Sequence, residues 1–131
     1  MEEKIKDIYN CKKLEGYDSL VIWHNQVIEK PISELTVADV ARCIRQNLFL
    51  DAAYEMLLVY LLYNPYEGDL YEGELMDKAC EMSQDFVNSH KKIILEIIEK
   101  ANNFCKTHEW ECNEDRDEYL EAVNKLSKMI E

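Results

Sequence analysis

The chain has 131 residues and a formal net charge of −12, with only three glycines and two prolines. A chain of this length forms about one domain and buries roughly two thirds of its unfolded surface, so it needs no disulfide or metal for stability. The charge argues against nucleic acid as a direct partner, because phosphate binding depends on clustered Lys and Arg. Few helix breakers and abundant Glu, Leu, Ile and Lys indicate a single all-α domain over residues 1–131.

The cysteines and the apolar segments indicate the compartment. An odd number of cysteines, three of them inside helical patterns, fits a reducing cytoplasm better than a disulfide framework: Cys11, Cys43, Cys80, Cys105 and Cys112. The N-terminus has no apolar signal region, and the longest apolar run, 56–63, is far shorter than the roughly 20 residues of a membrane span. We therefore expect a soluble, cytoplasmic protein that is not exported and does not enter a membrane.

The first thirty residues contain two short helical patterns. We expect an amphipathic turn near residues 5–9 and a second helix after a cap at Asp18 or Ser19. The inward face of the second helix consists of Leu20, Trp23, His24, Val27 and Ile28. Trp23 is expected to be a core anchor and His24 a partly buried structural residue. A functional role for His24 stays open, although no nucleophile or acidic pair accompanies it.

The strongest helix signals lie between residues 36 and 63. Thr36 precedes an apolar-periodic run and Asp39 follows three residues later, which predicts a helix that begins at Val37. Its spacing leaves four polar residues facing outward: Asp39, Arg42, Arg45 and Gln46. From residue 50 to 63 polar residues nearly vanish, so this helix has to be surrounded by other elements. We expect a compact bundle of about six or seven helices around this central apolar helix.

The central helix ends at Asn64-Pro65, because proline cannot continue it. The loop YEGDLYEGE, residues 66–74, follows and contains two of the three glycines. Gly68 and Gly73 are expected to supply positive φ angles for two tight turns. The tyrosines of the loop can lie on apolar surface with their hydroxyls in water. We therefore expect an ordered loop.

The last part of the chain is predicted to form three helices. The first covers residues 74–82, and the second is one continuous apolar stripe from Phe86 to Cys105, about 30 Å long. The third runs from Asp115 to Met129, with Asn113 as a candidate cap. Its inward residues are Tyr119, Leu120, Val123, Leu126 and Ile130. We find no linker, internal repeat or domain boundary.

Residues 31–76 carry an ordered set of motifs: P-x-x-x-L-T-V-x-D, then R-Q, then the apolar helix with Asn-Pro, then E-G-D-x-Y-x-G-E-L-M. In this order they resemble the immunity proteins of bacterial contact-dependent growth inhibition (CDI) systems. The resemblance implies a small helical protein, made by the toxin-bearing cell, that binds and blocks the C-terminal toxin domain of a large delivery protein. Asn47 departs from the family pattern, in which a glycine follows the Arg-Gln pair. The chain also continues far beyond Met76, so the resemblance implies little about residues 77–131.

The negative charge is concentrated in two short stretches. Residues 64–77 carry five acids and no base, and residues 109–121 carry seven acids against Arg116 alone. The rest of the chain is therefore nearly neutral. A localised field of one sign speeds encounter with a partner of the opposite sign.

A metal site is the first alternative to a binding function. Cys105, His108 and Cys112 have spacings that a zinc site could use, but no second pair of ligands lies nearby. The other reading is that Cys105 belongs to the helix stripe and the other two residues lie in a connecting loop. We therefore expect no metal and no other cofactor.

Catalysis by loop carboxylates is the second alternative. The pairs Glu67/Asp69 and Glu72/Glu74 resemble acid–base pairs, but a glycine-containing surface loop offers little of the burial that separates their pKa values. No phosphate-binding loop and no nucleophile motif is recognisable. We therefore predict no catalytic residues and no enzymatic activity.

Toxin specificity is expected outside the shared motifs, because family members face toxins of different kinds. We therefore expect toxin specificity to lie in residues 77–131. The alternative interpretation of the acidic stretch 109–121 is a solvated helix start, whose acids interact favourably with the N-terminal end of the helix dipole. Tyr71, Trp110 and Tyr119 are candidate aromatic anchors. The full set of candidate toxin-binding residues is Glu109, Trp110, Glu111, Asp115, Asp117 and Glu118, with Glu67, Asp69, Tyr71 and Glu72 from the loop.

We predict an immunity protein that neutralises its cognate CDI toxin domain by binding it, without chemistry of its own. A nuclease is the expected toxin, because its phosphate-binding site is cationic and an acidic surface can occupy or cover it. The alternative is a helical adaptor or homodimeric interaction protein without a toxin partner. Homodimerisation of an immunity protein also stays open.

Overall fold

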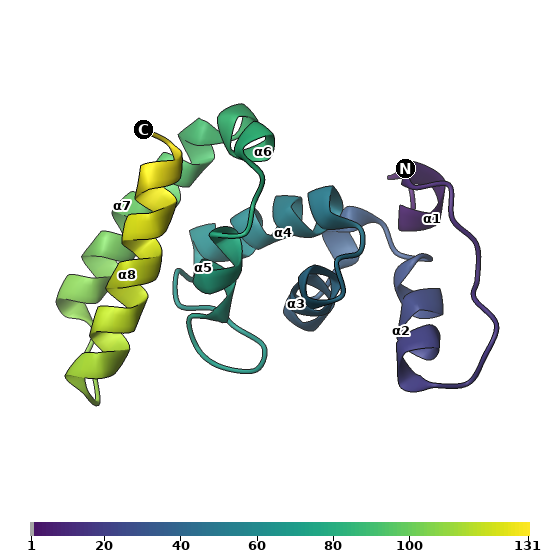
Figure 1. The fold of residues 1–131 in the computed structure, drawn as a ribbon, viewed down its shortest axis with the longest axis horizontal. Helices are drawn as coiled ribbons and strands as arrows, with labels where there is room; N and C mark the ends of the chain where they lie inside the picture. The colour runs from purple at the N-terminus through teal and green to yellow at the C-terminus, as the bar shows by residue number, and fades with distance from the viewer. Residues whose placement is uncertain (1) are drawn as a thin grey trace. The chain divides into compact units, whose positions relative to one another are not determined.

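The computed structural model describes residues 2–131, which form eight α-helices and one 3-10 helix, with no strand among them (Figure 1). The elements are α1 (Ile5–Ile8), α2 (Ser19–Val27), η1 (Ile32–Glu34), α3 (Val37–Arg45), α4 (Leu50–Tyr63), α5 (Glu74–Ala79), α6 (Gln84–Ser89), α7 (Lys91–Thr107) and α8 (Asn113–Met129). The predicted all-α class is confirmed. The contacts divide the chain into two units, residues 1–56 and 57–131, and each is described by itself.

The first unit contains a buried acid that joins α2 to α3. Asp39 is 6 % exposed, so the prediction that it faces outward is wrong. Its carboxylate accepts hydrogen bonds from Trp23 Nε1 (3.0 Å), Lys30 Nζ (2.7 Å) and the Thr36 amide (3.1 Å). The Thr36 hydroxyl accepts from the Asp39 amide in return (3.0 Å), which completes a capping box. The Arg42 guanidinium lies 4.9 Å from the centre of the Trp23 ring, and Trp23 is the core anchor that the sequence predicted.

The C-terminal end of α3 turns at Asn47, the position where the resemblance predicted a glycine. Asn47 has a φ of 57°, in the left-handed region that glycine adopts freely and asparagine tolerates. The amide of Leu48 donates to the Cys43 carbonyl (2.9 Å), and the amide of Asn47 donates to the Ile44 carbonyl (3.1 Å). These two bonds form a Schellman motif, which satisfies the carbonyls of Cys43 and Ile44 at the end of the helix.

The apolar helix α4 begins and ends at the predicted residues, Leu50 and Tyr63. Its buried residues are Ala52, Ala53, Tyr54, Leu57, Leu58 and Leu61. Val59 and Tyr63 are 38 % and 86 % exposed, however, so the helix is not enclosed on every side as its composition predicted. Tyr and Val at these positions contribute apolar surface without entering the core.

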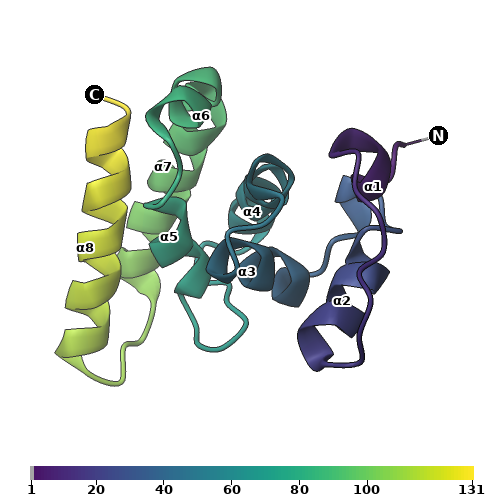
Figure 2. The ribbon, with the colours of Figure 1, turned by 45° about the vertical axis from the view of Figure 1, so that its right-hand side comes forward.

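In the second unit, α8 lies along α7 and contacts α5 (Figures 1 and 2). The core between these helices consists of Leu75, Met76, Ala79, Ile94, Ile97, Ala101, Val123 and Leu126. The helix α8 begins at Asn113, two residues before the predicted start, and Cys112 rather than Asn113 occupies the cap position. This packing places the N-terminal half of α8 over the loop that precedes α5.

The predicted continuous helix from Phe86 to Cys105 is two helices. His90 leaves the helical conformation, with φ −128° and ψ 21°, and separates α6 from α7. Its Nδ1–H donates to the Phe86 carbonyl (2.7 Å), and its ring stacks on the Phe86 ring with centroids 4.0 Å apart. The break adds one helix to the predicted number, while Phe86 and Ile94 remain buried on both sides of it.

Candidate functional site

The loop 66–74 is held by a buried carboxylate. Glu74 is 1 % exposed, and its Oε1 accepts hydrogen bonds from the amides of Asp69 and Leu70, both at 2.9 Å. The amide of Gly73 donates to the Tyr66 carbonyl (2.7 Å), and the amide of Leu75 donates to the Glu67 carbonyl (3.0 Å). These bonds close the loop on itself. Glu74 therefore stabilises the loop and is not one of its surface charges.

The two loop glycines have different roles. Gly73 has a φ of 87°, as predicted for a tight turn. Gly68 has no positive φ, so that part of the prediction is wrong. A Cβ atom on Gly68 would lie 1.8 Å from the Tyr71 carbonyl oxygen, so the position requires glycine because the chain approaches itself closely. Both glycines are thus needed for the path that carries Tyr71.

Tyr66 anchors the other side of the loop in a cluster of rings. Four ring centroids lie between 5.1 and 5.3 Å from its own: those of Phe104, His108, Trp110 and Tyr119. The Tyr119 hydroxyl donates to the Pro65 carbonyl, and Trp110 Nε1 donates to the Cys105 carbonyl (3.2 Å). Among residues 2–131 no three His, Cys, Asp or Glu side chains are placed to share a metal ion.

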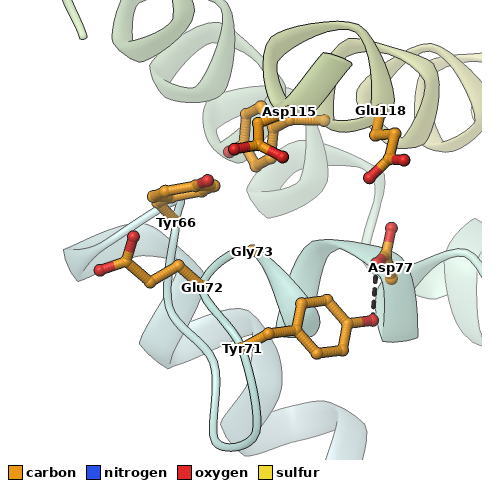
Figure 3. A pocket seen from close by; sticks show the side chains of 8 residues that line it. Tyr66, Tyr71, Glu72, Gly73, Asp77, Asp115 and Glu118 are labelled. Carbon is orange, nitrogen blue, oxygen red and sulfur yellow. Dashed lines mark hydrogen bonds between the residues drawn. The ribbon is translucent and has the colours of Figure 1, made fainter. Parts of the chain in front are cut away.

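A pocket of about 280 Å³ lies between the loop, α5 and α8 (Figure 3). We call it the acidic pocket, and its lining residues are Tyr66, Tyr71, Glu72, Gly73, Asp77, Asp115, Glu118 and Tyr119. Figure 3 shows Asp115 and Glu118 extending from α8 toward the loop, with the carboxylates of Glu118 and Asp77 turned toward one another. The Tyr71 hydroxyl donates to Asp77 Oδ2 (2.7 Å). The described part of the chain contributes no Lys, Arg or His to this lining.

The three phenols of the pocket are held in their neutral form. Burial raises the pKa of Tyr66, and the carboxylates of Glu72 and Asp115 raise it further. Burial and the hydrogen bond to Asp77 raise the pKa of Tyr71. Burial also raises the pKa of Tyr119. Each hydroxyl therefore stays a donor at neutral pH, and the charge of the pocket comes from its carboxylates.

The structure brings together four of the ten candidate residues, Tyr71, Glu72, Asp115 and Glu118, in the acidic pocket. The other six lie outside its lining. The Glu67 carboxylate accepts a hydrogen bond from the Asn64 side chain (3.1 Å). The backbone amide of Asp69 donates to the Glu74 carboxylate. Trp110 belongs to the ring cluster around Tyr66. Glu109 and Glu111 are exposed before α8, and Asp117 pairs with Arg116 at 3.4 Å.

Sequence reasoning did not select Tyr66 and Asp77, which complete the pocket. The signals were present, because Tyr66 opens the first of two Tyr-Glu-Gly units and Asp77 is the last acid of the stretch 64–77. The two acidic stretches were also treated as separate candidates, whereas the packing of α8 against α5 joins them in one site.

These observations define a small, acidic, all-α protein in which four carboxylates from two acidic stretches line one surface pocket. A model of the family of CDI immunity proteins matches residues 6–97, which is more than half of the chain, and the chain belongs to this family. Its role is therefore that of an immunity protein, which neutralises a cognate CDI toxin. The match is wider than the resemblance over residues 31–76. No curated protein matches the chain.

The limits of the family match divide the acidic pocket. The loop 66–74 and Asp77 lie inside the match, while residues 98–131, and with them the whole of α8, lie outside it. Asp115, Glu118 and Tyr119 thus come from a part of the chain that the family model does not describe. Separately, within residues 2–131 none of the helices combines the length and the apolar character that crossing a bilayer demands.

Proposed function

We propose that this immunity protein binds its toxin through the acidic pocket and the exposed acids around it, and that the toxin is a nuclease. The single observation that carries the proposal is the convergence of two acidic stretches on one pocket without a lining base in the described chain. A nuclease needs cationic groups to hold phosphate, so its active site or the approach to it is complementary to such a surface.

The proposed interface combines charge with aromatic contact area. Tyr71 is 51 % exposed and sits beside the carboxylates of Glu72 and Asp77. Leu70, next to it, is 69 % exposed, so the tip of the loop also offers apolar area. Aromatic residues near the centre of an interface commonly carry much of the binding energy, whereas charges at the rim mainly increase the association rate. Tyr71 is therefore the proposed anchor and the outer acids supply steering.

The proposed inhibition is stoichiometric and requires no reaction by this chain. The protein would act in the cytoplasm, where a nuclease toxin meets its substrates. Glu109, Glu111 and Asp117 extend the negative surface along α8 and the residues before it. No direct contact with nucleic acid is proposed, because the acidic surface repels phosphate. Self-association of the immunity protein stays a prediction that its oligomeric state in solution will test.

The test uses the C-terminal toxin domain of the CDI delivery protein that is cognate to this chain. That domain is purified and assayed on tRNA, other RNA and DNA, and its association with the immunity protein is followed at about 50 and 200 mM salt. Double reversal, Asp115→Lys with Glu118→Lys, should slow association at least tenfold at low salt and flatten the salt dependence. The control reverses Glu96 and Glu99, exposed acids of α7, and should change the rate less than twofold.

Two outcomes would contradict the proposal separately. A toxin domain that is bound and neutralised but cleaves no nucleic acid would remove the nuclease assignment. Equal association rates for the α8 reversal and the α7 control would remove the acidic pocket from the interface, although the protein would remain an immunity protein.

A further inference from the structure

The free acidic pocket has an electrostatic imbalance that a partner can relieve. Asp77 and Glu118 face one another across it, and Glu72 and Asp115 line the same space. The Tyr71 hydroxyl donates to Asp77, but the described chain supplies no cation to the lining. Carboxylates that share a site without a counter-charge repel one another, so a cation that enters gains attraction from several sides.

A neighbouring hollow on α8 has a different set of charged lining residues. It shares Asp77 and Glu118 with the acidic pocket and adds Glu121, but its lining also contains Lys125. The carboxylates of Glu72 and Asp115 are not shared with this hollow, and the described residues that line the acidic pocket around them include no lysine or arginine.

The other lining groups favour one cation. The rings of Tyr66 and Tyr71 line the pocket beside its carboxylates, and a cation within about 6 Å of a ring face is attracted to it. A guanidinium is flat, stacks on rings and offers five donors in one plane, whereas an ammonium is a compact, strongly hydrated point charge. The carboxylates of Glu118 and Asp77, which face one another beside these rings, suit the flat group because its paired N–H donors can reach both carboxylates at once.

We infer that the acidic pocket receives the side chain of a single arginine of the toxin. This inference rests on the proposed function and adds the chemical identity of the group that is recognised. Because Asp115, Glu118 and Tyr119 lie outside the family match and Tyr71 and Glu72 lie inside it, α8 makes the arginine contact particular to this chain. The arginine should be a hot spot, since it is desolvated in a pocket at the centre of the contact.

The first test measures Kd with the toxin domain. Glu72→Gln, Asp115→Asn and Glu118→Gln keep the size of each side chain and remove its charge, and Glu96→Gln on α7 is the control. Each pocket variant should weaken binding at least tenfold and the control less than twofold. Each toxin arginine is then changed to lysine. One such change should cost at least tenfold with the wild-type protein and much less when Asp115 is already Asn.

The outcomes separate this inference from the proposed function. If the toxin binds wild type and the pocket variants within twofold of each other, the arginine assignment is overturned while the immunity role stands. If no toxin arginine is coupled to the pocket, the assignment is also overturned. If the toxin does not bind the wild-type protein at all, the proposed function fails.

A second test needs no toxin. Ethylguanidinium chloride is added to the isotope-labelled protein, and the NMR signals of the Tyr66 and Tyr71 rings and of the Gly73 amide are followed. Ethylammonium chloride at the same concentration is the comparison. Guanidinium should shift these signals at least threefold more than ammonium, and Asp115→Asn with Glu118→Gln should abolish the difference. Equal shifts from both cations would show unspecific attraction by the acids and would overturn the preference for arginine.

Discussion

Replacing Glu74 by alanine tests whether a buried carboxylate holds the loop of the acidic pocket. Glu74 is 1 % exposed and accepts two hydrogen bonds of 2.9 Å from the amides of Asp69 and Leu70. A hydrogen bond to a charged group contributes about 1.5–3 kcal/mol. Asp69 and Leu70 are exposed, so their amides regain water in the variant and the lower value applies. We expect Glu74→Ala to lower the free energy of unfolding by about 3 kcal/mol.

The loss is measured by urea unfolding, followed by circular dichroism at pH 7 and low salt. For a chain of this length it corresponds to a Tm lower by about 10 °C. Glu74→Gln keeps an acceptor oxygen and should lose about 1 kcal/mol. Glu72→Ala, an exposed acid of the same loop, is the control and should stay within about 0.5 kcal/mol of wild type. If Glu74→Ala lowered the free energy of unfolding by less than about 1 kcal/mol, the hydrogen bonds between backbone groups alone would hold the loop.

Three further substitutions test the buried Asp39, the turn at Asn47 and the charge of Glu118. Burial raises the pKa of Asp39, but its hydrogen bonds outweigh burial and hold it below the ordinary 3.8. Asp39→Asn should therefore cost about 2 kcal/mol at pH 7, and this difference should shrink as the pH falls below about 3.8, since protonation then removes the same interactions. Urea titrations at pH 3 and 7 that gave one constant difference would contradict this. Asn47→Gly should raise the free energy of unfolding by about 0.5 kcal/mol, because glycine adopts the positive φ of this position without strain. A variant less stable than wild type would show that Asn47 carries no backbone strain. Glu118→Gln should raise the Tm of the free protein by about 1 °C at low salt, because it relieves repulsion between Glu118 and Asp77. At 1 M salt, which screens this repulsion, the Tm should not change. A lower Tm at low salt would show that the charge of Glu118 is already compensated.

Local signals in the sequence predicted the starts and ends of several helices. Thr36 and Asp39 form the capping box that places the start of α3 at Val37, and the apolar run gives both ends of α4. The break at His90 was missed, because the apolar spacing continues through it. His90 stacks on Phe86 and so maintains the stripe while its own backbone leaves the helix. Periodicity reports which face is buried, and it does not report whether the helix is continuous.

The buried acids were the other limit of the sequence reading. Asp39 and Glu74 count toward the net charge like any surface acid, yet both are buried because backbone amides and ring or amine donors satisfy them. Some of their hydrogen-bond donors lie nearby in the sequence, but the burial of these two acids depends on helix packing, which cannot be derived from composition. The acidic pocket was only half predicted for the same reason. Its two stretches lie far apart in sequence and meet only because α8 packs on α5.

Neutralisation by binding fixes the stoichiometry of toxin inhibition, which a titration can measure. The toxin domain is held at a fixed concentration far above its Kd, and its activity is measured as the immunity protein is added. We expect a linear fall to zero at one equivalent, with the toxin recovered intact from the complex. Full activity at an excess of immunity protein, or loss of activity at a small fraction of one equivalent, would contradict neutralisation by binding.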